Sequence, residues 1–68
     1  MRYAVVIEKA GDGFSGYVPD LPGCIAAGES VAQVRAALAE VIPFHLDGLR
    51  AGGAAVPAAE SAVGWVEV

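Results

Sequence analysis

The run from Val18 to Cys24, V-P-D-L-P-G-C, constrains the path of this chain more than any other feature. Its two prolines hold φ near −65° and bias the residues before them toward extended geometry, while Gly23 can take a positive φ. Asp20 lies between the prolines and can accept hydrogen bonds from downstream amides. The run therefore predicts a tight turn that leads one strand into the next.

Three short strands are expected around this turn. In residues 2–9 successive side chains would point to opposite faces of a strand, and both faces would be largely apolar, which predicts a central strand. The glycine-containing segment 10–13 suits a hairpin into a second strand, 14–18, and Gly16 within that strand indicates a bulge or a close backbone approach. A third strand at 24–27 follows the turn. Together these segments predict an antiparallel meander.

A helix is predicted to begin after Ser30, because Gln33 completes a capping box with it. Side chains that are apolar except for His45 then recur every three or four residues, as on one helical face: Val31, Val34, Leu38, Val41, Ile42, His45 and Leu49. Pro43 predicts a kink near 39–43 and not an end, because the apolar period continues beyond it. Gly52 and Gly53 supply the C-terminal stop.

A closing strand is predicted at Val63 to Val68, and it contains Trp65. A right-handed crossover would place this strand parallel to the first one. The sequence thus predicts an α+β fold with βββαβ order, in which a mixed four-stranded sheet of order 3-2-1-4 carries one helix on one face. We expect a single domain over residues 1–68, and association through the uncovered sheet face or through the edge at 63–68.

Composition limits the classes of function. A chain of 68 residues buries only about 60% of its unfolded surface, yet 56% of this chain is hydrophobic, so we expect a homo-oligomer, dimer or tetramer, or another partner. The net charge of −4 offers no footprint for phosphates and favours a cationic protein over nucleic acid. No segment is typical of a signal peptide or a membrane span, so a cytoplasmic location is expected.

No catalytic, cofactor or metal site is predicted. Cys24 is the only cysteine and lies among apolar residues, where a thiol acts as a small hydrophobe. His45 falls on the apolar helix face with no nucleophile in view, which favours a structural role. A metal-dependent nuclease needs several converging carboxylates. We do not expect Glu8, Asp12, Asp20 and Glu40 to meet.

Nearly the whole chain resembles the HicB antitoxins. The resemblance lies in V-P-D-L-P-G-C, in Gly28-Glu-Ser30 before the helix, and in H-L-D-G-L at 45–49. It implies a degenerate RNase H-like domain that binds and silences a small basic toxin, HicA, which cleaves messenger RNA. Many family members add a C-terminal DNA-binding module. This chain ends at Val68, and we expect no such module in it.

Four residues are candidate partner contacts: Asp20, Leu21, Glu29 and Trp65. Asp20 is either a local turn former or a contact, and Trp65 is either part of the core or an interface anchor. The leading hypothesis is a non-catalytic antitoxin that neutralises a HicA-like toxin. The alternatives are an orphan homo-oligomeric domain without a toxin and a residual metal-dependent nuclease.

Overall fold

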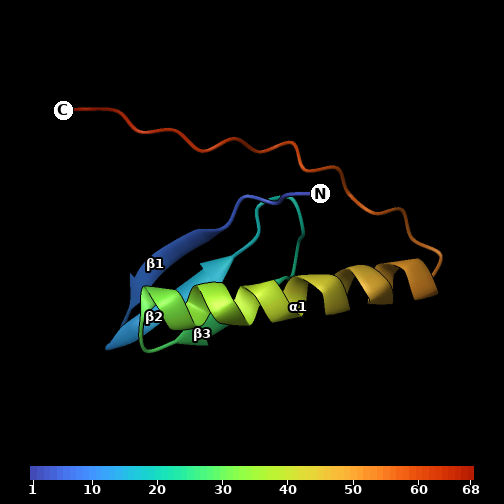
Figure 1. Ribbon diagram of the computed structural model, residues 1–68, viewed down its shortest axis with the longest axis horizontal. Coiled ribbons are helices and arrows are strands. Elements are labelled where there is room, and N and C mark those ends of the chain that lie inside the picture. The colour runs from blue at the N-terminus through green and yellow to red at the C-terminus, as the bar shows by residue number, and fades with distance from the viewer.

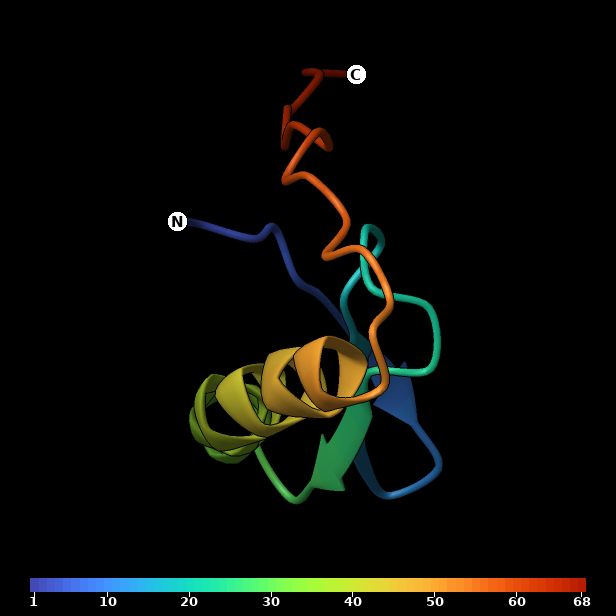
Figure 2. The same cartoon turned by 90° about the vertical axis from the view of Figure 1, so that its right-hand side faces the viewer.

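The computed structural model describes residues 1–68 and contains three strands and one long helix (Figure 1). The strands are β1 (Val6–Ala10), β2 (Gly13–Tyr17) and β3 (Ile25–Gly28), and the helix is α1 (Val31–Ala51). The sheet is antiparallel with the order β1-β2-β3. Helix α1 contacts all three strands and lies on one side of the sheet (Figure 2). The predicted α+β class and antiparallel meander are confirmed.

Gly16 is the point of closest approach between the sheet and the helix. The pairing of β2 runs without interruption through Ile7↔Gly16 and Gly16↔Ala26, so there is no bulge. A Cβ atom at Gly16 would lie 2.6 Å from Cγ1 of Val34 and 3.0 Å from Cδ1 of Leu38. Of the two interpretations of this glycine, the close approach is correct, because α1 packs directly on the backbone of β2.

Strand β1 is shorter than predicted and lies at an edge of the sheet. It begins at Val6, which pairs with Tyr17, the last residue of β2. The chain turns away after Tyr17, so residues 1–5 find no partner strand on that side. The prediction of a central strand over 2–9 is wrong, because no strand flanks β1 on its other side.

Both ends of α1 follow the predicted capping chemistry. The hydroxyl of Ser30 accepts a hydrogen bond from the Gln33 amide at 3.1 Å, and the Gln33 side chain accepts one from the Glu29 amide at 2.9 Å. The helix continues through Pro43 to Ala51, while the expected kink stays a prediction. Gly53 then takes a φ of 75° and its amide donates to the carbonyl of Arg50. The capping box and the glycine stop are confirmed.

The core combines side chains from α1 with side chains from the turn after β2. Its buried members are Val18, Leu21, Cys24, Val34, Leu38 and Leu46. The predicted apolar face therefore holds for Val34 and Leu38, whereas Val31 at the first turn is about half exposed. Leu46 was not among the predicted residues, although it stands eight positions after Leu38 on the same side of the helix.

The residues after α1 form neither helix nor strand. We call residues 54–68 the C-terminal segment. Val63–Val68 is not a strand, so the predicted fourth strand and the order 3-2-1-4 are absent, and the sheet is purely antiparallel and not mixed. The physical reason is that side chains hold the segment near residues 57–61, and its remainder makes no backbone hydrogen bond to β1. Helix α1 does not have the sustained hydropathy that crossing a membrane requires.

Candidate partner-binding site

The turn between β2 and β3, residues 18–24, is closed by its own backbone. The amide of Val18 donates to the carbonyl of Cys24 at 3.1 Å, and two shorter turns follow from Leu21 to Val18 and from Cys24 to Leu21. Gly23 has a φ of 83°, which glycine adopts without strain because it has no Cβ. The side chains of Val18, Leu21 and Cys24 point into the core. Burial raises the pKa of the Cys24 thiol, in keeping with its predicted role as a small hydrophobe.

Asp20 holds the C-terminal segment. Its carboxylate accepts hydrogen bonds from the amide of Glu60 at 3.0 Å, from the amide of Ser61 at 2.9 Å and from the Ser61 hydroxyl at 2.8 Å. We call these three bonds the Asp20 latch. Asp20 is thus neither a cap of local amides nor a free carboxylate, because its oxygens accept hydrogen bonds from residues 40 and 41 positions away. No pattern in the sequence indicates this pairing.

A second contact holds the same segment. The hydroxyl of Tyr3 donates to the carbonyl of Pro57 at 2.6 Å, and Val56 packs against the core. Beyond Ser61 the segment leaves the body of the protein and runs beside residues 1–5, as Figure 1 shows. Arg2–Ala4 and residues 61–63 line a pocket of about 310 Å³ between the two stretches.

The Asp20 latch should open in acid. The Ser61 amide, the Ser61 hydroxyl and the Glu60 amide lower the pKa of Asp20, while slight desolvation opposes them. A carboxylate whose pKa is lower in the folded state stabilises the fold above its unfolded pKa and loses that effect as pH falls through the folded value. We expect the amide resonances of Glu60 and Ser61 to titrate with a midpoint below that of an ordinary aspartate. The same resonances should be unaffected by Asp12→Asn, and a midpoint at or above the ordinary value would contradict the latch.

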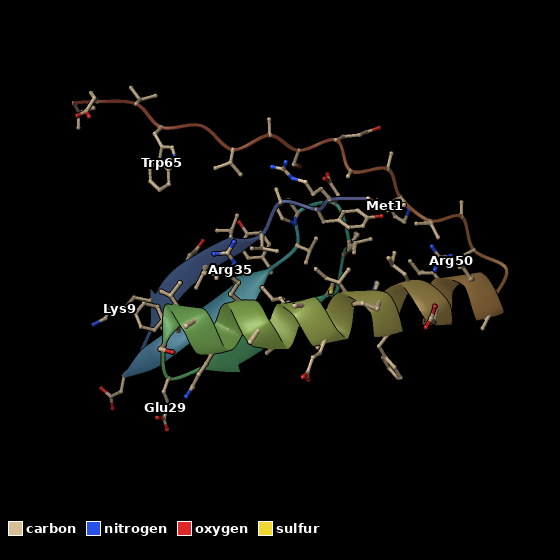
Figure 3. The ribbon with its side chains drawn as sticks, viewed as in Figure 1. Met1, Lys9, Glu29, Arg35, Arg50 and Trp65 are labelled. Carbon is tan, nitrogen blue, oxygen red and sulfur yellow. The ribbon has the colours of Figure 1, made fainter.

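The four candidate contacts are in very different environments. Leu21 is 0% exposed, so none of its side chain is available to a partner in this conformation, and it belongs to the core. Trp65 is 95% exposed, which excludes the interpretation that it is a core residue. Glu29 points into solvent from the connection between β3 and α1 (Figure 3). Asp20 acts on the C-terminal segment, and so indirectly on the position of Trp65.

The sheet face opposite α1 carries an exposed apolar row. Val6 pairs with Tyr17, and Tyr17 pairs with Ile25, so the three side chains lie side by side across the strands. Tyr17 and Ile25 are exposed. The row is covered by no element of this chain, as the sequence predicted for one sheet face.

The titratable residues are dispersed over the structure. No group of three histidine, cysteine, aspartate or glutamate side chains could hold a metal ion. Glu40 and Asp47 lie on the exposed side of α1, where Asp47 pairs with Arg50 at 3.5 Å. His45 is half-buried on the helix. This arrangement suits a binding surface formed by exposed apolar and acidic residues.

Comparison with known proteins identifies the class. That class is the antitoxins of bacterial toxin-antitoxin systems. The chain belongs to the family of HicB-like antitoxins, whose model matches residues 3–67. A chain of a solved HicA3 and HicB3 toxin-antitoxin complex is 34% identical, with a TM-score of 0.70 over 81% of this chain and 64% of that one.

A phage protein is also similar. It is an uncharacterised 14.9 kDa protein in the rep-hol intergenic region of Haemophilus phage HP1, and it is 41% identical over 49 residues, which are 72% of this chain and 37% of that protein. The present chain thus spans little more than a third of the phage protein and just under two thirds of the solved chain.

Proposed function

We propose that this chain is a non-catalytic antitoxin that binds a small basic HicA-like toxin and blocks its cleavage of messenger RNA. The observation that carries the proposal is the likeness, at 34% identity and a TM-score of 0.70, to a chain from a HicA3 and HicB3 complex. A toxin that attacks messenger RNA acts in the cytoplasm, so we place this chain there as well.

The charge distribution supports a basic partner. The chain carries a net charge of −4, and most of its carboxylates are exposed: Glu8, Asp12, Glu29, Glu40, Asp47, Glu60 and Glu67. Opposite charge accelerates association and disfavours like-charged partners, including nucleic acid. A protein of this charge can mask a ribonuclease by covering the basic surface on which RNA would bind.

We assign one contact with the toxin to Glu29. Its side chain projects from the β3–α1 connection, close to the end of the sheet where the β1–β2 turn carries Asp12 (Figure 3). The apolar row of Val6, Tyr17 and Ile25 crosses the opposite end of the sheet and can supply apolar contact area to a partner that spans its length. Protein–protein interfaces combine such apolar contacts with a polar rim.

The experiment is to mix this chain with a purified HicA-like toxin, taken first from any neighbouring gene that encodes a small basic protein, and to measure both binding and RNA cleavage. We expect a stable complex and loss of cleavage at stoichiometric antitoxin. Glu29→Lys should slow association about tenfold at low salt, because it reverses a charge at the contact. Glu40→Lys makes the same change in net charge on the exposed side of α1 and is the matched control.

Two results would contradict the proposal. Undiminished RNA cleavage at saturating antitoxin would exclude neutralisation of that toxin. Absence of any complex would favour the orphan domain without a toxin. No observation in the structure favours the nuclease alternative, since its carboxylates form no group that could hold a metal ion.

A further inference from the structure

The C-terminal segment ends in a stretch that has the chemistry of a β-strand and no partner. Val63, Trp65, Val66 and Val68 are all exposed, and β-branched and aromatic residues favour strands. No backbone group beyond Ala54 bonds to another backbone group. A stretch this apolar is costly to leave in water, and its unpaired amides and carbonyls can still form a ladder.

An unpaired strand edge is available on the same chain. β1 pairs only with β2, so its outer edge presents free backbone groups, and residues 2–5 lead into it without any backbone hydrogen bond of their own. Each copy thus carries a strand-forming stretch without a partner and, at the outer edge of β1, backbone groups without a partner strand.

The latch explains why the stretch does not close on its own β1. Asp20 and Tyr3 hold residues 57–61 by four hydrogen bonds, and residues 61–63 lie across a pocket of about 310 Å³ from Arg2–Ala4 instead of bonding to them. Pairing within the chain would require these bonds to break. A second molecule can reach the exposed stretch while the latch stays intact.

We propose that residues 62–68 pair with the outer edge formed by residues 2–5 and the start of β1 in a second copy of this chain, and that the second copy returns the same contact. Because each copy gives one stretch and receives one, the two-fold arrangement closes as a dimer. The charges agree, since Arg2 lies at the acceptor edge and Glu67 in the donor stretch. Trp65, which points from the segment back toward the sheet in Figure 3, becomes the anchor of the interface.

This interface has the size to be stable. Two tryptophans alone would bury on the order of 400 Å², a third of the roughly 1,200 Å² found in the smaller specific interfaces. The two paired strands and the neighbouring valines contribute the remainder. The inference does not depend on the antitoxin proposal, because it concerns this chain alone.

The test is hydrogen exchange of the full chain, followed residue by residue by NMR over a range of protein concentrations, with sedimentation at the same concentrations. We expect a dimer in which the amides of residues 2–5 and 63–67 become protected together, and loss of that protection on dilution to the monomer. Protection that persists in the monomer would mean pairing within the chain and would overturn the proposal. A dimer without protected amides in these two stretches would overturn it as well.

Two substitutions separate this interface from any other. Trp65→Ala should weaken dimerisation at least tenfold, because a fully exposed aromatic anchor is removed without any change to the core. Phe44→Ala removes an aromatic from α1 that is 80% exposed and should leave the dimer unchanged. Val66→Pro should abolish pairing, since proline cannot donate to the ladder. A dimer of unaltered strength in both segment variants would refute the exchange of strands.

Discussion

Leu21→Ala is expected to destabilise the fold by about 2–5 kcal/mol, the usual cost of deleting buried methyl groups from a leucine. Leu21 has no exposed surface and lies in the core cluster with Val34 and Leu38. A chain of this length has only about 3–10 kcal/mol of total stability. The variant should therefore be partly or wholly unfolded at 25 °C, as measured by urea denaturation followed by circular dichroism.

Two further variants keep this prediction testable if Leu21→Ala does not fold. Leu21→Met nearly conserves volume and should cost less than about 1.5 kcal/mol. Ile25→Ala removes a side chain that is 68% exposed and should change stability by less than about 1 kcal/mol. A Leu21→Ala variant as stable as Ile25→Ala would show that Leu21 is not a core residue, and its predicted role as a partner contact would return.

Gly16→Ala is expected to lower stability by about 1–3 kcal/mol, because a single added carbon must push α1 away from the sheet. The new Cβ would lie 2.6 Å from Cγ1 of Val34 on the helix and 3.3 Å from Cγ1 of Ile7 on the neighbouring strand, so both side chains restrict the space open to it. Thermal unfolding should show a lower midpoint with unchanged helix content.

Gly48→Ala is the matched control, and its expected effect on stability has the opposite sign. Gly48 lies inside α1, and nothing is within 4 Å of the position of its Cβ. Alanine in a helix interior is more favourable than glycine by about 0.5–1 kcal/mol, so this variant should be more stable. Equal effects of the two substitutions would mean that Gly16 does not mark the contact between helix and sheet.

The features that could be predicted from the sequence are those determined by neighbouring residues. The turn at 18–24, the capping box at Ser30 and the stop at Gly52–Gly53 depend on backbone restrictions and hydrogen bonds within a few positions. The packing of α1 on Gly16 was also predictable in kind, since a glycine inside a strand leaves room for a close approach. The family model matches residues 3–67 and so covers all of these stretches.

The features that could not be predicted join residues far apart in the chain. The bonds from Asp20 to Glu60 and Ser61 follow from no local pattern, because a carboxylate between prolines is equally compatible with a turn or a partner. The apolar alternation of 63–68 does indicate a strand, but a strand needs a partner at hydrogen-bonding distance. The latch holds the preceding residues elsewhere. Leu21 was predicted to be a partner contact and not a core residue, because a turn residue is ordinarily exposed.

The turn at 18–24 supplies three of the six buried core residues, at every third position, Val18, Leu21 and Cys24. Half of the core is thus presented by a segment that has neither strand nor helix periodicity. Two prolines interrupt the same seven residues, and proline reduces the number of conformations open to the chain before it folds. Ordering this part of the core therefore costs less conformational entropy than ordering an ordinary loop. The small core thus gains thermal stability because the two prolines restrict the unfolded chain.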